Sequence, residues 1–266
     1  MLDKKLNYLM PYEVNELVRL GCKQDGGYVV SRESLESCNF LLSFGMAENW
    51  SFEEDFIKYN NFNKVHIYDH TVNINFFLIR LYKSIKRIFY FKSNFRNIIQ
   101  KILDIKNYLY LKKLNIFHFK EKVSNTNSTN DSNIKKIFSR IKENNKIILK
   151  IDIEGDEYEI LEELNSLSEL IHTLIVEFHY LDKKREQFEK IINKINDNFI
   201  IVHLHGNNDT DYCKDGLPKT LEITFINKKN ALNAEKKLQC KFPIKGLDFP
   251  NITYKEELIM EFCDAT

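Results

Sequence analysis

Two carboxylates stand at alternate positions where an apolar run ends. Asp152 and Glu154 close a predicted buried strand over 147–153, and side chains alternate between the faces of a strand, so both are expected on one face. Buried carboxylates are costly unless they are paired or bind a ligand. A metal, a hydroxyl donor or a cationic group would satisfy them. An acidic start to the next helix explains Asp156 and Glu157 but leaves Asp152 unexplained.

Two further pairs of polar residues with i, i+2 spacing end the next two predicted parallel strands. Glu177 and His179 form one pair, and His203 and His205 form the other. A single core histidine often has only a structural role, but two such pairs beside Asp152 favour catalysis or metal binding. Either His179 or His203 is a candidate general base for a hydroxyl nucleophile, with Asp152 beside it. The candidate ligands of a divalent metal, Mg²⁺ or Mn²⁺, are Asp152, Glu177, His179 and His205.

A glycine and an acidic residue suggest a nucleotide site. Gly45 follows an apolar run at 39–44, and Asp69 ends the next predicted strand, 24 residues later. A glycine turn lets the backbone approach a cofactor, and a strand-end carboxylate can bind ribose hydroxyls. A tight turn and a solvated aspartate are the structural alternatives. The chain lacks G-x-G-x-x-G at this turn, which argues against a nicotinamide-dependent oxidoreductase.

Strands that alternate with helices place these residues on a mostly parallel sheet. The connection at 206–219 is short and polar, so the last strand is expected to be antiparallel. The predicted strands are 28–30, 39–44, 65–69, 115–123, 147–153, 174–179, 199–205 and 221–226. The predicted helices are 11–20, 50–60 with Ser51 as N-cap and Glu54 completing a capping box, 133–144, 156–164, 181–196 and 256–262.

The segment 72–114 is a basic insertion of two predicted helices. It contains ten Lys or Arg residues and one acidic residue, Asp104. It is expected to receive an anionic acceptor or to contact anionic lipid peripherally, and a solvated helix face is the alternative. If it binds the acceptor, neutralising Lys83, Lys86 and Arg87 should raise the acceptor KM.

Composition limits the remaining function classes. The net charge is +1, so no nucleic-acid partner is expected, although a nucleic-acid-binding protein that uses the insertion is the rival from another class. The five cysteines include no C-x-x-C pair, which favours a reducing cytoplasm. The first residues lack a signal peptide's apolar region, and no run of about 18 apolar residues predicts a membrane span.

Four motifs resemble the FkbM-type methyltransferases: Ser43-Phe44-Gly45, Tyr68-Asp69, the run KIDIEGDE at 150–157, and Glu177-Phe178-His179. Asp25-Gly26-Gly27-Tyr28 and the run HLHGNN at 203–208 are similar to a bacterial subset linked to capsule and surface glycans. The resemblance covers roughly 20–70 and 115–226. It implies a class I methyltransferase Rossmann-like fold, an α/β sheet of seven strands with the last one antiparallel. The chain would be a single domain over 1–266, with an N-terminal extension at 1–37 and the insertion at 72–114.

The resemblance also implies a donor and a reaction. S-adenosylmethionine would methylate an oxygen of a sugar or another component of a bacterial capsule or surface polysaccharide. Gly45 and its neighbours would contact the methionine part, Asp69 the ribose, and Val123 and Ser124 the adenine. The alternatives are a phosphoramidate-type capsule acceptor, a nucleic-acid methyltransferase that uses the insertion, and an inactive glycan-binding relative. The implied donor-binding residues are Tyr28, Ser43, Phe44, Gly45, Met46, Ala47, Glu48, Asp69, His70, Val123, Ser124 and Asp152.

Overall fold

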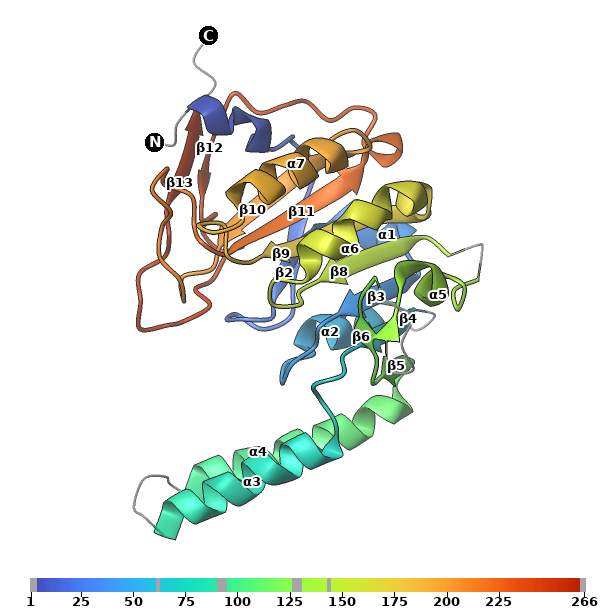
Figure 1. The fold of residues 1–266 in the computed structure, drawn as a ribbon, viewed down its shortest axis with the longest axis vertical. Coiled ribbons are helices and arrows are strands. Elements are labelled where there is room, and N and C mark those ends of the chain that lie inside the picture. The colour runs from blue at the N-terminus through green and yellow to red at the C-terminus, as the bar shows by residue number, and fades with distance from the viewer. Residues whose placement is uncertain (1–3, 61–62, 90–94, 126–130, 143–144, 264–266) are drawn as a thin grey trace.

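A seven-stranded sheet forms the centre of the computed structural model, which describes residues 4–60, 63–89, 95–125, 131–142 and 145–263 (Figure 1). Its strand order is β10-β11-β9-β8-β3-β4-β5. The strands are β3 (Phe40–Phe44), β4 (Lys64–Tyr68), β5 (Ile116–Phe119), β8 (Ile147–Ile151), β9 (Ile171–Phe178), β10 (Phe199–Gly206) and β11 (Leu221–Asn227).

The pairing of these strands confirms the predicted fold class. β3 pairs in parallel with both β4 and β8, β4 with β5, and β8 with β9. Only β11 runs the other way in this sheet, because it is inserted antiparallel between β9 and β10. The sheet is therefore doubly wound, with β3 and β8 at the point where the strand order reverses. This is the class I methyltransferase Rossmann-like fold.

Helices cover both faces of the sheet and bury its apolar side chains. One face packs against α1 (Arg32–Ser37) and α2 (Ser51–Tyr59). The other packs against α5 (Ile134–Phe138), α6 (Glu157–Leu164) and α7 (Arg185–Ile195). Because both faces are covered, every residue of β3, β8 and β9 is buried, which explains why apolar side chains dominate these strands. Four short 3₁₀ helices lie at Lys4–Leu9, Leu111–Lys113, Asn165–Leu170 and Lys228–Asn230.

The basic insertion forms a helical hairpin, as the periodicity of its apolar residues predicts. Its helices are α3 (Ile74–Phe89) and α4 (Phe95–Tyr110), and Figure 1 shows them side by side, extending away from the sheet. The intervening residues 90–94 lie outside the described residues. An aromatic cluster fixes the base of the hairpin, since the Trp50 ring lies 6.1 Å from Phe77 and 6.2 Å from Tyr108.

The predicted N-terminal helix at 11–20 is wrong. Residues Leu17–Leu20 form β1, which pairs antiparallel with β2 (Tyr28–Ser31) in a separate ladder. Three apolar residues at helical spacing are weak evidence, and here the cross-strand hydrogen bonds outweigh that local pattern. The predicted strand at 28–30 is confirmed.

The predicted C-terminal helix at 256–262 is also wrong. Met260–Cys263 form β13, which pairs antiparallel with β12 (Gln239–Phe242). The end of the predicted strand 115–123 is a separate short strand, β6 (Lys122–Val123), paired with β7 (Asp131–Ser132). The helix predicted at 133–144 is confirmed only as far as Phe138, and its last two residues lie outside the described residues.

The start of α2 differs from the predicted capping box. Trp50 occupies the N-cap position and makes no side-chain cap hydrogen bond. The Ser51 hydroxyl instead accepts the backbone N–H of Cys22 at 2.9 Å, and Glu54 accepts the Trp50 indole N–H at 2.9 Å. A hydrogen bond to a distant loop therefore replaces the local cap.

Candidate functional site

A cleft of about 390 Å³ opens at the carboxyl ends of β3, β4 and β8. Ligands of doubly wound sheets bind at this place, where the strand order reverses. Its lining residues are Gly45, Met46, Ala47, Tyr68, Asp69, His70, Thr71, Glu121, Lys122, Val123, Asp152, Ile153, Glu154 and Asp156. The structure thus brings seven of the predicted donor-binding residues together: Gly45, Met46, Ala47, Asp69, His70, Val123 and Asp152.

Gly45 closes the floor of the cleft in a conformation that favours glycine. Its φ angle is +81°, and a Cβ atom added there would lie 1.7 Å from the carbonyl oxygen of Asp152. The Gly45 N–H donates to the Tyr68 carbonyl at 3.0 Å. The loops after β3, β4 and β8 therefore meet at this glycine without room for a side chain.

Asp69 lies in the cleft, where its carboxylate is fully hydrogen bonded. One oxygen accepts the backbone N–H groups of Met46 and Ala47 at 3.0 and 3.1 Å. The other accepts the N–H and the hydroxyl of Thr71 at 2.7 and 2.6 Å. Burial would raise the pKa of Asp69, but these bonds outweigh burial and lower it. In this state Asp69 shapes the loop after β3, so ribose hydroxyls would have to replace bonds already made.

The other predicted donor-binding residues do not line the cleft. Phe44 is buried against the Tyr68 ring, and the Ser43 hydroxyl donates to Glu53 at 2.6 Å beneath α2. Glu48 forms ion pairs with Arg80 and, at 3.4 Å, with Lys101 of the hairpin. The Tyr28 hydroxyl donates to Asp152 at 2.8 Å, and the Ser124 hydroxyl donates to Asp131 at 3.3 Å.

A buried lysine, missed at the sequence level, supports the glycine turn. Lys150 is buried in β8, and its Nζ donates to the Gly45 carbonyl at 2.8 Å. The same atom lies 3.6 Å from Asp152 and 3.9 Å from Glu53. Burial would lower the pKa of Lys150, but the surrounding carboxylates outweigh burial and raise it. The sequence did contain a signal for this lysine, because a charged residue within an apolar strand requires partners when it is buried.

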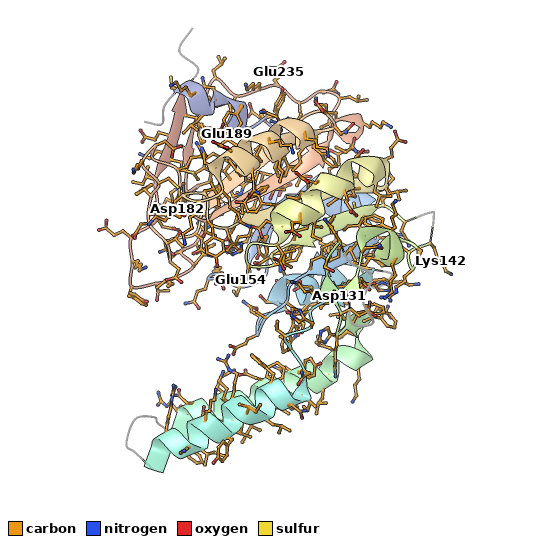
Figure 2. All side chains as sticks on the ribbon, viewed as in Figure 1. Asp131, Lys142, Glu154, Asp182, Glu189 and Glu235 are labelled. Atoms are coloured by element: carbon orange, nitrogen blue, oxygen red, sulfur yellow. The ribbon has the colours of Figure 1, made fainter. Side chains whose placement is uncertain are left out.

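Asp152 lies between this lysine and a group of acidic residues beyond β9. It follows β8, so the predicted strand over 147–153 ends two residues early, at Ile151. Its carboxylate accepts the Tyr28 hydroxyl at 2.8 Å and lies 4.0 Å from Nε2 of His179. Glu154, labelled in Figure 2, has a φ of +55° and is exposed. The expected strand alternation of the two carboxylates is therefore replaced by a turn.

His179 is surrounded by carboxylates. Its Nε2 lies 3.6 Å from Glu154 and 4.0 Å from Glu177, and its Nδ1 lies 3.5 Å from Glu157. Burial would lower the pKa of His179, but Glu157, Glu177 and Asp152 outweigh burial and raise it to about 9. The imidazole is therefore protonated at neutral pH in this state, which suits a positioning cation better than a general base.

Glu177 shares the predicted strand face with His179, but its surroundings disfavour its charged form. Burial raises its pKa well above the ordinary value, and the nearby charges of Asp152 and Glu222 raise it further. Its side chain accepts the Asn207 amide at 2.8 Å. A raised pKa opposes metal ligation by Glu177, because a carboxylate has to be deprotonated to bind a metal.

Three side chains in this cluster offer ligand atoms for a metal. One atom each of Asp152, Glu154 and His179 lie within 4.8 Å of one another. Two metal–ligand bonds of about 2.1 Å span at most roughly 4.2 Å, so these atoms must approach slightly, which the exposed Glu154 allows. This set of one nitrogen and two carboxylates suits Mn²⁺. Among the described residues, the group includes neither Glu177 nor His205, which corrects the predicted ligand set.

The two histidines of β10 lie outside the cleft. His203 is buried, with Nε2 3.0 Å from Asp248 and its ring against Phe242. His205 is also buried, with Nδ1 3.2 Å from Glu222 and Nε2 3.4 Å from Glu257. Each is satisfied by a carboxylate from the C-terminal segment or from β11. The structure therefore does not bring His203, the predicted general base, or His205, the predicted metal ligand, to the cleft.

Replacing His205 by Gln should destabilise the fold by roughly 3 kcal/mol near pH 6, because the buried Glu222 and the partly buried Glu257 lose their shared cation. Burial would lower the pKa of His205, but Glu222 and Glu257 raise it from 6.5 to about 10. Protonation therefore stabilises the fold fully below pH 6.5, and that stabilisation is lost as the pH rises through about 10. Urea unfolding of both proteins should show the difference shrinking between these limits. A difference independent of pH would contradict this assignment.

Comparison with known proteins finds solved structures of low similarity and no family. No family model and no curated protein matches it. It is similar to the fibrillarin pre-rRNA processing protein of Methanococcus jannaschii at 10% identity and a TM-score of 0.40, over 84% of this chain and 74% of that one. It is also similar to a precorrin-6y C5,15-methyltransferase from Geobacter metallireducens at 9% identity and a TM-score of 0.37, over 74% and 87%. A dimethyladenosine transferase from Plasmodium falciparum matches at 10% identity and 0.37, over 75% and 61%.

Proposed function

We propose that this protein is an S-adenosylmethionine-dependent O-methyltransferase that acts on a sugar or another component of a bacterial capsule or surface polysaccharide. The observation that carries the proposal is a cleft at the strand-order reversal of a methyltransferase fold, with Asp152 on its wall. The motifs at 43–45, 68–69, 150–157 and 177–179 that resemble FkbM-type enzymes lie at this cleft or directly behind it.

The cleft provides the elements that a nucleoside donor requires. Its volume of about 390 Å³ falls within the range of small-molecule sites. The loop of Gly45, Met46 and Ala47 brings backbone atoms to one wall, where the methionine part would lie. Val123, next to β5, provides an apolar surface for the adenine. Asp69 would support donor binding by holding this loop in place. It would bind the ribose hydroxyls once its present hydrogen bonds rearrange.

Asp152 is the carboxylate placed to act on the acceptor. The acceptor oxygen attacks the methyl carbon, the C–O bond forms as the C–S bond breaks, and the hydroxyl proton has to leave. The partly exposed carboxylate of Asp152 can take this proton at the cleft wall. His179, protonated in this state, would hold the carboxylates in place and stabilise the developing negative charge on oxygen.

A divalent metal is the second part of this proposal. Asp152, Glu154 and His179 would hold it once the imidazole had lost its proton, and it would supply Lewis-acid polarisation of the acceptor hydroxyl in place of proton removal by Asp152. Titration with Mn²⁺ followed by calorimetry tests this directly. Binding that is lost in Glu154→Gln would support the site, and no heat of binding by the wild type would remove the metal from the proposal.

A basic groove next to the cleft supports an anionic acceptor. It has a volume of about 220 Å³ and is lined by Arg80, Lys83, Ser84, Arg87 and Lys101. Arg80 and Lys101 also pair with Glu48, which follows directly on the loop at Gly45. A phosphate or diphosphate in this groove would therefore be linked to the donor loop through a single residue. Nucleotide-linked and phosphorylated sugars have this chemistry.

Neutralising two of these side chains should weaken acceptor binding. The double variant Lys83→Gln/Arg87→Gln is expected to raise the acceptor KM about tenfold or more, since it removes two charge-assisted contacts. The matched control is Lys86→Gln, because Lys86 is exposed on the same helix but does not line the groove. Steady-state kinetics at fixed donor concentration measure both. Equal KM values in all three proteins would show that the acceptor does not use the groove.

Transfer of a labelled methyl group tests the function itself. The enzyme is incubated with S-adenosylmethionine labelled in the methyl group and a panel of nucleotide-linked hexoses and heptoses. Label in a methyl ether that survives acid hydrolysis would support methylation of a sugar oxygen. Acid-labile label from an acceptor with a phosphorus–nitrogen bond would favour the phosphoramidate alternative, and label in RNA would overturn the glycan proposal.

A further inference from the structure

The side of the α3–α4 hairpin opposite the basic groove is an apolar surface. In α3, Phe77, Leu81 and Ser84 are wholly or partly buried, and the residues that follow each by one position, Leu78, Tyr82 and Ile85, are exposed. Spacings of three and four residues place these side chains in one stripe along the helix.

A second stripe runs along α4. Ile98, Ile105 and Tyr108 are partly buried, and the residues one position later, Ile99, Lys106 and Leu109, are exposed. In both helices the exposed residues follow the residues at the helix–helix contact by one position. Because the two helices are antiparallel, these two stripes lie on the same side of the hairpin. The exposed large apolar residues of the hairpin are Leu78, Ile79, Tyr82, Ile85, Phe95, Ile99, Ile102, Leu103, Leu109 and Tyr110.

This surface is too large and too continuous for an ordinary solvated helix face. No residue of α4 is fully buried among those described, and Tyr82 and Phe95 are 65% and 70% exposed. Figure 2 shows the side chains of the hairpin standing away from the body of the molecule. Contiguous exposed apolar patches of this kind mark interaction surfaces.

Charge decides which partner fits. The segment 72–114 carries ten basic residues and one acidic residue, so packing two copies together would bring like charges close. Lys86, Arg96 and Lys106 are exposed among the apolar side chains. A nucleic acid would pair with these cations but would leave the aliphatic residues in water. The surface of an anionic bilayer satisfies both, because phosphates bind the cations and the acyl boundary buries Ile, Leu and Phe.

The dimensions favour a hairpin that lies in the membrane surface. Each helix has 16 residues, which is about 24 Å at 1.5 Å per residue, shorter than the roughly 30 Å hydrocarbon core. Within the described part of the chain, no helix is long and apolar enough to cross a bilayer. We propose that the α3–α4 hairpin docks on anionic membranes through this apolar stripe, with the basic groove on its other side.

Vesicle co-sedimentation tests the proposal without reference to activity, so it is independent of the methyltransferase assignment. The full chain should bind vesicles of phosphatidylcholine with phosphatidylglycerol and not vesicles of phosphatidylcholine alone. Tyr82→Ser/Ile99→Ser should bind at least about tenfold more weakly. The control Leu232→Ser/Tyr254→Ser removes even more exposed apolar side chains elsewhere and should bind as the wild type does.

Three results would overturn this inference. The first is no binding to the anionic vesicles, or equal loss in the control variant. The second is a dimer in sedimentation velocity that Tyr82→Ser/Ile99→Ser dissociates, which would assign the stripe to a second copy. The third is tight binding of RNA that the same variant abolishes. Both variants replace exposed side chains, and unchanged circular dichroism verifies that they are folded.

Discussion

Gly45→Ala should abolish detectable binding of S-adenosylhomocysteine and lower the free energy of unfolding by roughly 2–4 kcal/mol. The φ of +81° strains any other residue, and the added Cβ would lie 1.7 Å from the Asp152 carbonyl oxygen. The backbone at this turn therefore has to move. This movement disrupts the hydrogen bonds that Met46 and Ala47 donate to Asp69, together with the one that Lys150 donates to Gly45. Urea unfolding and calorimetry measure the two effects.

Gly246→Ala is the matched control for this change. Gly246 has a φ of +84°, but a Cβ atom there meets nothing within 4 Å. This variant should lose about 1 kcal/mol from backbone strain alone and should bind the ligand normally. If the two variants lose equal stability, the close approach at Gly45 is not what holds the cleft together.

Asp152→Asn should lower the turnover number by about 10²- to 10⁴-fold, with the donor dissociation constant within a few-fold of wild type. The amide keeps the shape of the side chain, and one of its oxygen positions can still accept the Tyr28 hydroxyl, which now donates at 2.8 Å. It removes the negative charge that would take the acceptor proton. Single-turnover transfer of labelled methyl separates this step from binding.

Asp211→Asn provides the control for a lost carboxylate. Asp211 is exposed, and its nearest cation is Lys219 at 4.0 Å, so this variant should turn over as the wild type does. A turnover of Asp152→Asn within about tenfold of wild type would show that another group takes the proton, or that none is needed.

The sheet could be predicted from the sequence because both of its faces are buried. Parallel strands between two helical layers are mostly apolar, and Phe40–Phe44 and Ile147–Ile151 have that signature apart from Ser43 and Lys150. Asp69 could be placed at the cleft by the same argument, since a polar residue directly after such a strand has to lie at its carboxyl end. The hairpin was predictable because its helices are long and strongly periodic.

The elements that were mispredicted depend on partners distant in sequence. Leu17–Leu20 pair with Tyr28–Ser31, and Met260–Cys263 pair with Gln239–Phe242, so no local period identifies them. His203 faces Asp248, 45 residues away. A histidine at a strand end is consistent with a catalytic role or a satisfied core role until that partner is known.

The buried charges behind the cleft were the hardest to foresee. Lys150 is noticeable as a charge within an apolar strand, but its partner Glu53 lies on another element and alone resembles a solvated helix residue. Only the register of Ser43 with Lys150 in the sheet brings the lysine to the Gly45 carbonyl. The charge group therefore follows from tertiary packing, while the glycine above it is visible in the sequence.

Calorimetric titration with S-adenosylhomocysteine, on wild type and Asp69→Ala, tests the central claim most directly. The wild type should bind with a dissociation constant on the order of micromolar. Asp69→Ala should bind at least about tenfold more weakly, because the loop of Met46 and Ala47 loses its charge-assisted hydrogen bonds. No binding by a folded wild-type protein, with or without added Mn²⁺, would contradict the assignment as a methyltransferase.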